Sequence, residues 1–436
     1  MSAPARAEAA AADVADAAPL PAAERGEVFV YAGLILLILN FAAPVGGFLS
    51  TPLTFFMKNR LHLQAHQLAA FNFWTGLPLY LAFAFGFLRD RWSPLGAGDR
   101  GHLALFGAAT AAIFAGLAFV EPTYGALFVG VLAATALLQI VGAAANGLIT
   151  SIGQARAVSG EASAIVNIST CAPAVAGYAL GGVLSGAMEG EQAGAAARTL
   201  FLAAAGLMAL AALLGALGPK RVFAEEPQRP TMSALADIGR LLRAWPVVPP
   251  LIMLALWDFA PAMGAVLPYH LADALHASDA DVGLWYALFY AANIPSLAAY
   301  FWLCRRVRLS RLIVIATLIA IPQMAPLLFV HSVSGALLAA IPMGLMGGLA
   351  SAAYIDLAIR ACPAGLQGTL MMLILGAIFY AAARLGDLWG ASLYDTRGGF
   401  TLTVIASIGV YALILPVLAL ADRRLMATRD GEAAIA

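Results

Sequence analysis

The stretch YGALFVGVLAATALLQIVGAAANGLI, residues 124–149, decides the fold class of this chain. It contains no charged residue and exceeds the about 20 residues that a helix needs to cross the hydrocarbon core of a bilayer. The rest of the sequence has the same character, since 62% of the 436 residues are hydrophobic, 11% are charged and the mean hydropathy is +0.86. We therefore expect an integral membrane protein, and a soluble multidomain enzyme is excluded.

Apolar runs separated by charged residues, prolines and glycines predict twelve membrane-spanning helices, six in each half of the sequence. We expect the spans near residues 28–50, 66–88, 102–120, 124–149, 162–185, 199–218, 248–269, 282–303, 312–330, 334–359, 367–393 and 399–421. The predicted fold class is an all-α membrane protein with 12 transmembrane helices in two pseudo-symmetric six-helix halves.

The polar segments predict the domain limits. Residues 1–25 and 423–436 are expected to be cytoplasmic tails, the first of them disordered. Between the tails we expect an N-terminal half at 26–218, a connector at 219–247 and a C-terminal half at 248–422. In the connector, an apolar helical face predicts an amphipathic helix that lies on the inner membrane surface or packs against protein. That face carries Leu235, Ile238, Leu241, Leu242 and Trp245.

The basic residues predict the orientation. If the side with both termini is cytoplasmic, it holds 19 of the 24 lysines and arginines, as the positive-inside rule requires. Because arginine and alanine are abundant, as in proteins from GC-rich bacterial genomes, we expect the plasma (bacterial inner) membrane. The formal net charge of zero gives no reason to expect a nucleic-acid partner.

The two halves of the sequence repeat each other. Four features of the first two spans recur in the seventh and eighth at offsets of 216 to 218 residues. They match Asn40-Phe41 to Asp258-Phe259, Pro52 to Pro268, Pro78 to Pro295 and Arg89 to Arg305. Near-constant separation predicts two homologous halves related by an axis along the membrane normal.

This organisation resembles the major facilitator superfamily of secondary transporters. The segment Gly86-Phe87-Leu88-Arg89-Asp90-Arg91 is similar to the glycine, acidic and basic loop that latches the two halves of that superfamily on the cytoplasmic side. The resemblance implies that Asp90 accepts hydrogen bonds across the interface and that Arg91 pairs locally. The second copy, Cys304-Arg305-Arg306-Val307-Arg308, has neither glycine nor acid, so only the first copy should latch. A simple positive-inside cluster would explain the arginines but not Gly86 and Asp90.

A second segment, residues 360–370, is similar to a stretch of the folate-biopterin transporter family. That family typically shows a cysteine, proline, glycine, acidic residue, alanine and threonine in this order, and Gln367 stands here in place of the acid. The second span departs from the family because it lacks a lysine before Pro78. Bacterial relatives of that family need not carry pterins.

Four charged residues lie inside predicted spans, where an ionised group costs about 2.5–3.5 kcal/mol on insertion scales. They are Asp258, Asp356, Arg384 and Asp387. At a rise of about 1.5 Å per residue, Asp258 lies about 15 Å from the inner boundary, close to the midplane, and Arg384 lies about 21 Å from it. We predict that Asp258 and Arg384 face one cavity, where they pair with each other or bind opposite charges on a substrate.

The other charges have simpler alternatives. Asp387 lies one turn from Arg384 and either binds the substrate or coupling ion or neutralises that arginine. Asp356 and Arg360, also one turn apart, are predicted to form an inner gate or interface cluster. Uncharged candidates for the cavity lining are Asn40, Trp74 and Asn293, and further candidates are Asn146, Asn167, Tyr286 and Tyr354.

These features predict a secondary active transporter, not an enzyme. It would move a small amphiphilic or zwitterionic organic solute by alternating access, coupled to an ion, most simply a proton. We expect a monomer in the lipid bilayer without metal or cofactor. The alternative is a major-facilitator-like membrane assembly factor or receptor that does not transport. Bulky side chains in place of a cavity at Asp258 would favour that alternative.

Overall fold

The computed structural model describes residues 22–44, 48–187, 193–223, 239–241, 243–396 and 399–432, and these residues are almost entirely helical. Within them, eleven helices are long and apolar enough to cross a membrane, and a shorter apolar helix covers Trp245–Asp258. The predicted all-α membrane fold is confirmed.

The N-terminal half contains eight helices in the described residues. They are α2 (Ala22–Ala42), α3 (Ser50–Asn59), α4 (Ala65–Tyr80), α5 (Ala82–Arg91), α6 (Gly98–Phe119), α7 (Tyr124–Ala155), α8 (Ser159–Ala187) and α9 (Ala193–Leu217). The first helix begins at Ala22, four residues before the predicted boundary of this half.

The C-terminal half repeats this order. It contains α11 (Val248–Asp258), α12 (Val266–Leu275), α13 (Asp279–Leu303), α14 (Leu309–Ala320) with the 3-10 turns η4 (Ile321–Phe329), α15 (Val333–Ala361), α16 (Gln367–Met372), the π-helix η5 (Leu373–Ile378), α17 (Phe379–Tyr394), α18 (Gly399–Ala412) and α19 (Ile414–Ala419). The short helix α20 (Arg423–Met426) follows.

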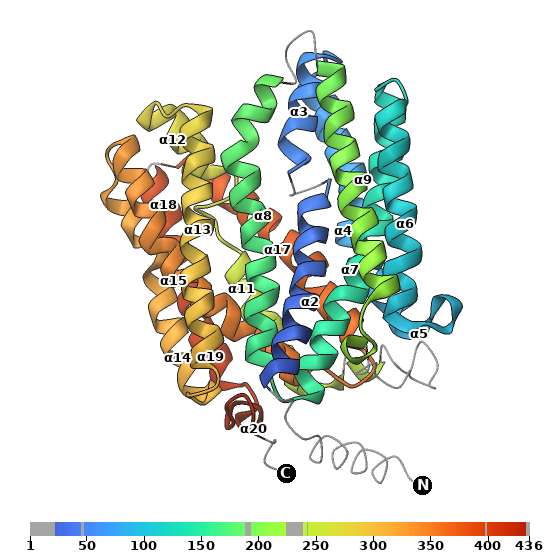
Figure 1. The fold of residues 1–436 in the computed structure, drawn as a ribbon. Coiled ribbons are helices and arrows are strands. Elements are labelled where there is room, and N and C mark those ends of the chain that lie inside the picture. The colour runs from blue at the N-terminus through green and yellow to red at the C-terminus, as the bar shows by residue number, and fades with distance from the viewer. Residues whose placement is uncertain are drawn as a thin grey trace.

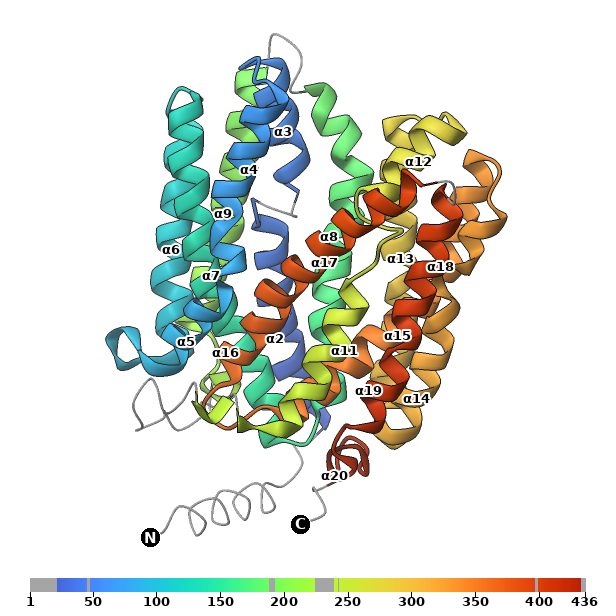
Figure 2. The ribbon, with the colours of Figure 1, turned by 180° about the vertical axis from the view of Figure 1, so that it is seen from behind.

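The two halves stand side by side, blue to green on one side and yellow to red on the other (Figure 1, Figure 2). The start of α2 and the helix α20 lie at the same end of the bundle (Figure 1), and we call this end the tail side and the opposite end the far side.

The first helix of each half is interrupted, which the sequence did not predict. The expected span 248–269 is two helices, α11 and α12, and the expected span 28–50 holds most of α2 and ends where α3 begins. Pro44 and Pro261 lie in the two breaks. Proline lacks a backbone N–H and clashes with the preceding turn, which favours a break at these two positions, whereas α8, α13 and α15 continue through Pro173, Pro295 and Pro342.

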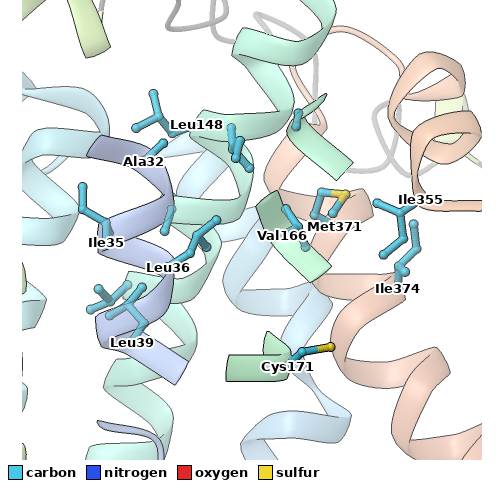
Figure 3. Close-up of a cluster of buried hydrophobic side chains, with 14 of the residues drawn as sticks. Ala32, Ile35, Leu36, Leu39, Leu148, Val166, Cys171, Ile355, Met371 and Ile374 are labelled. Atoms are coloured by element: carbon cyan, nitrogen blue, oxygen red, sulfur yellow. The ribbon is translucent and has the colours of Figure 1, made fainter. Parts of the chain in front are cut away.

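The hydrophobic core joins the halves in the tail-side part of the bundle. Figure 3 shows Leu36 on α2 and Val166 on α8 in a cluster with Ile355 on α15, Met371 on α16 and Ile374 on η5. All five side chains are at most 4% exposed. The core is continuous across the interface, so the halves form one packed body on this side.

The connector and the C-terminal tail lie outside the predicted spans. Most of the expected amphipathic helix of the connector falls in residues 224–238, outside the described residues. The expected C-terminal tail is folded back on the bundle as far as Glu432, since Thr428 and Asp430 are 7% and 6% exposed.

Candidate transport site

A cavity of about 420 Å³ lies between the halves, which is within the size range of small-molecule binding sites. Residues of α2, α7 and α8 line it from the N-terminal half, and residues of α11, α13, α15 and η5 line it from the C-terminal half. Its polar and aromatic lining includes Asn40, Gln139, Asn146, Asn167, Trp257, Asp258, Tyr290, Asn293, Gln323, Tyr380 and Tyr411. Among the described residues of this lining, Asp258 alone has a charged side chain.

Asp258 is the last residue of α11, at the break in the interrupted helix. Within the described part of the chain, no hydrogen bond and no ion pair reaches its carboxylate. The backbone carbonyls at a helix C-terminus carry partial negative charge, so this position attracts a positively charged occupant rather than an anion.

Asn40 occupies the corresponding place in the N-terminal half and also lines the cavity. Its Nδ2 donates to the carbonyl of Leu36 at 3.0 Å. Asn293 lies on the same cavity wall as Asp258, with its Nδ2 bonded to the carbonyl of Phe289 at 2.9 Å. The structure therefore brings three of the predicted site residues together.

Two amide oxygens in the lining have no donor within the described structure. They are Asn146 Oδ1 and Gln323 Oε1, both buried. The amide nitrogens of the same side chains are committed to backbone carbonyls, those of Gly142 at 2.9 Å and Met343 at 3.0 Å. These bonds fix which end of each amide is the acceptor, so two buried amide oxygens of cavity-lining residues lack a donor, which favours an occupant that donates hydrogen bonds.

Aromatic rings supply the apolar surface of the cavity. Trp257 stacks on Tyr411 with ring centroids 4.9 Å apart and meets Tyr354 edge to face at 5.8 Å. Tyr380 pairs with Tyr80 across the halves at 5.8 Å. These rings can pack an apolar body or the face of a cation.

Arg384 does not share this cavity, contrary to our expectation. It lines a second cavity of about 190 Å³ among residues of α3, α4 and α17, and the two cavities share Pro44, Leu79 and Tyr380. Its guanidinium lies 3.4 Å from Asp387 on the next turn and is 68% exposed. Arg384 pairs with Asp387 and not with Asp258, and Arg384 and Asp258 line two adjoining cavities.

Asp387 is held by backbone. Its Oδ1 accepts a hydrogen bond from the N–H of Ala265, the residue that precedes α12, at 3.0 Å. A carboxylate at this helix N-terminus is favourable, so Asp387 connects α12, the second part of the interrupted helix, to α17.

Trp74, which was predicted to line the cavity, lines neither cavity. Its side chain is 51% exposed and lies beside Phe73.

On the tail side, Asp90 bridges the halves. It accepts hydrogen bonds from the backbone N–H of Gly368 at 3.0 Å and Thr369 at 2.7 Å, and from the hydroxyl of Thr369 at 2.7 Å. A Cβ on Gly86 would lie 2.8 Å from Thr369 Cα, so only glycine allows α5 this close to α16.

Arg89, which was not among the predicted gating residues, makes the buried ion pairs of this loop, with Asp90 at 2.8 Å and with Asp99. Arg91, for which the resemblance implied local pairing, lies over the ring of Phe87 at 5.4 Å. The sequence does not distinguish the two arginines at the end of α5, whereas in the structure Arg89 is buried against Gly147 of α7 and pairs with Asp99, and Arg91 is only half-buried.

Asp356 and Arg360 form part of a larger tail-side cluster. Arg360 donates to Asp356 at 2.7 Å and to Asp430 at 2.9 Å, and Tyr300 donates to Asp356 at 2.8 Å. Neither Asp356 nor Arg360 lines the two cavities described above.

Glu161 extends this cluster across the halves. It pairs with Arg305 of the C-terminal half and with Arg25, whose Nε lies 2.9 Å away. Glu161 and Asp430 were not predicted as site residues, because a charged residue near the end of a helix is usually solvated.

Within the described residues, no cluster of histidine, cysteine and acidic side chains could hold a metal ion.

Comparisons with known proteins extend these findings. A profile of the major facilitator superfamily matches residues 36–386. No curated protein sequence matches the chain. Among solved structures, the transporter FucP in its outward conformation matches with a TM-score of 0.64 and 15% identity, over 90% of this chain and 98% of FucP.

Two further structures match to a similar extent. A bacterial homologue of the iron transporter ferroportin, in an outward-facing state, has a TM-score of 0.62 and 15% identity over 90% of this chain and 98% of its own. The human organic anion transporter MFSD10 has a TM-score of 0.58 and 16% identity over 92% of this chain and 100% of its own. At these identities the likeness establishes the fold.

Proposed function

This chain belongs to the major facilitator superfamily and is a secondary transporter, and from that premise we propose that it moves a small amphiphilic organic solute with a positively charged group. The central cavity carries this proposal, since Asp258 is its one charged side chain among the described lining residues. The positive group would bind Asp258, the unpaired oxygens of Asn146 and Gln323 would accept its hydrogen bonds, and the aromatic rings would pack its apolar part.

A zwitterionic solute fits the same proposal if it is long enough. Its cationic end would bind Asp258, and its anionic end would reach Arg384 through the adjoining second cavity, which shares three lining residues with the first. A sugar is disfavoured, because the lining is mainly apolar and aromatic.

We infer that a proton is the coupling ion and that it competes with the solute for Asp258. A carboxylate without a partner binds either a proton or a cationic group, and occupancy by one excludes the other. In an alternating-access cycle, the solute and the proton would therefore cross the membrane in opposite directions.

The tail side is proposed to be cytoplasmic, which the distribution of basic residues supports. Because the hydrogen bonds of Asp90 and the pairs of Glu161 close this side, the present state would be outward-facing or occluded. FucP and the ferroportin homologue, the first two similar structures, are described as outward.

The alternative of a membrane assembly factor or receptor that does not transport is less well supported, since open space and not bulky side chains surrounds Asp258. The folate-biopterin resemblance stays a prediction. The residues that carry it, around Gln367 and Thr369, contact Gln154 and Asp90 at the interface, and they line neither cavity. Pteridines are therefore one class in the solute screen.

The test is transport by purified protein in liposomes, with a panel of organic cations, zwitterions and pteridines, a proton gradient and a pH-sensitive dye inside. We expect that uptake of a cationic amphiphile by liposomes with the wild-type protein moves protons out, so that the dye records a change in internal pH. Asp258→Asn should weaken solute binding about tenfold or more and abolish the proton signal, because a charge-assisted hydrogen bond is lost.

Asp395→Asn is the matched control, since Asp395 is an exposed acid just after α17 and lines neither cavity. It should behave as the wild type. Binding of neutral or anionic solutes in preference to cations, or full proton coupling in Asp258→Asn, would contradict the proposal.

A further inference from the structure

The second-half copy of the latch loop lacks an acid, yet the interface that it should latch is closed. In the first half, Arg89 is followed by Asp90, whereas Arg305 is followed by Arg306. The sequence therefore predicted one latch. The structure has two, and the acid of the second is Asp430, from the segment after α20.

The two aspartates bind their helices at the same positions. Asp90 accepts from the second and third residues of α16, Gly368 and Thr369. Asp430 accepts from the second and third residues of α8, Gly160 at 3.2 Å and Glu161 at 3.0 Å.

The second residue is glycine in both helices, and the reason is the same. A Cβ on Gly368 would lie 2.8 Å from Asp90 Oδ1, and a Cβ on Gly160 would lie 3.0 Å from Asp430 Oδ2. Absence of a side chain thus lets a carboxylate reach the N–H groups of each helix N-terminus, where its charge is stabilised.

We propose that residues 427–431 act as a C-terminal clasp, which replaces the acid missing from the second loop, holds the tail side closed and must release one half before that side opens. This inference does not depend on the identity of the solute.

The clasp is bound to both halves. On the N-terminal half, Asp430 contacts Gly160 and Glu161, and the N–H of Gly431 donates to the carbonyl of Ala157 at 2.8 Å. Because these contacts join the clasp to the first turn of α8 and the loop before it, they break if α8 moves away from the C-terminal half.

Contacts with the C-terminal half are more extensive. Arg360 donates to Asp430 at 2.9 Å and to the carbonyl and hydroxyl of Thr428 at 3.1 Å each. The N–H of Leu309 donates to the carbonyl of Thr428 at 3.2 Å, and the N–H of Asp430 donates to the carbonyl of Cys304 at 2.9 Å. We therefore expect the clasp to stay on this half when the tail side opens.

The charges around Asp430 also favour a closed state. Arg360 is shared between Asp430 and Asp356, and Glu161 is shared between Arg25 and Arg305. Among these pairs, Glu161 with Arg305 joins the two halves, so separation of the halves breaks this pair together with the hydrogen bonds from Gly160 and Glu161 to Asp430.

The experiment measures maleimide labelling of Cys304 and Cys362, two free cysteines that are 2% and 6% exposed near the tail-side contacts. It uses full-length protein in nanodiscs, with mass spectrometry to locate the label. In Asp430→Asn and in a protein that ends at Asp422, we expect the labelling rate to rise about tenfold, which corresponds to about 1.4 kcal/mol of lost interaction.

Glu432→Gln is the matched control, since Glu432 pairs only with Arg429 at 2.7 Å within the described structure and has the same charge change two residues away. It should be labelled at the wild-type rate. A synthetic peptide of residues 423–436 should protect the truncated protein, and the same peptide with Asp430→Asn should not.

The melting temperature separates opening from unfolding. A variant that labels faster at a near-wild-type melting temperature supports the clasp. Wild-type labelling rates in both Asp430→Asn and the truncated protein, or an equal increase in Glu432→Gln, would overturn it.

Discussion

At the scale of single residues, Asp258 and Asn40 illustrate how a repeated fold acquires an asymmetric site. Both side chains line the cavity from the first helix of their half. The amide of Asn40 is bonded within its own helix, whereas the carboxylate of Asp258 has no partner in the described residues. A lone carboxylate within a membrane-spanning segment is costly, so under the proposed function its occupant, proton or cation, would decide which state is favourable.

Asp430 gives a prediction on pH dependence. Burial, followed by the nearby Asp356, raises the pKa of Asp430 from 3.8 to about 7, although Arg360 and the N–H groups of Gly160 and Glu161 oppose the shift. The docked state therefore binds more protons than the free segment between these values. Docking is strongest at low pH, and it weakens as the pH rises towards and through 7. Asp430→Asn does not mimic the protonated acid, because its amide NH2 cannot accept a backbone N–H, whereas both oxygens of Asp430 do so.

The measurement is the labelling rate of Cys362 between pH 6 and 8, after correction for the reactivity of a model thiol. We expect it to rise with pH in the wild type and to stay flat in Asp430→Asn. The other groups that face the clasp are Asp356 and Arg360 from α15, Tyr300 and Cys304 from the end of α13, Arg305, and Glu161 from α8. A pH response that persists in Asp430→Asn would assign the titration to one of these.

At the scale of elements, the interrupted helix of the C-terminal half depends on a contact between its break and α17. Gly264 lies where a Cβ would overlap the carboxylate of Asp387. That carboxylate accepts the N–H of Ala265, so the glycine and the acid fit one another. The break is thus specified by two residues more than 120 positions apart.

A double-mutant cycle tests this fit. Gly264→Ala should lower the free energy of unfolding by about 1–3 kcal/mol, the usual cost of overpacking. In the Asp387→Ala background the same substitution should cost much less, because the clashing carboxylate is gone, which gives a coupling of about 0.5–3 kcal/mol.

Reversible unfolding in detergent provides the measurement. Gly409→Ala on α18, where a Cβ meets no described atom within 4 Å, is the control and should not destabilise the protein, since alanine is the better helix former. Additive effects of Gly264→Ala and Asp387→Ala would show that the two residues are independent.

At the scale of the whole molecule, two aspartates from different parts of the chain close the two tail-side seams. Asp90 closes the seam between α5 and α16, and Asp430 closes the seam between α8 and the C-terminal half. Because rocking of the halves separates both seams together, each aspartate opposes the same motion.

We expect Asp90→Asn and Asp430→Asn each to increase the population of the tail-open state, and the double variant to increase it by about the product of the two factors. Spin labels at the exposed Leu217 and Arg306 report this population through their distance distribution. A double variant that opens no more than one single variant would mean that the seams do not act on one equilibrium.

The sequence by itself determined the fold class, and it predicted the two repeated halves, the cavity position of Asp258 and Asn40, and the interface contact of Gly86 and Asp90. These follow from hydrophobic length, constant offsets and charges out of place, which are local properties of the chain. Tertiary structure alone decided that Arg384 lies in a second cavity, that Trp74 lines neither cavity, and that Asp430 replaces a missing acid. The physical reason is that pairing of charges and closure of cavities depend on which distant segments meet in space, and periodicity along one helix carries no information about that.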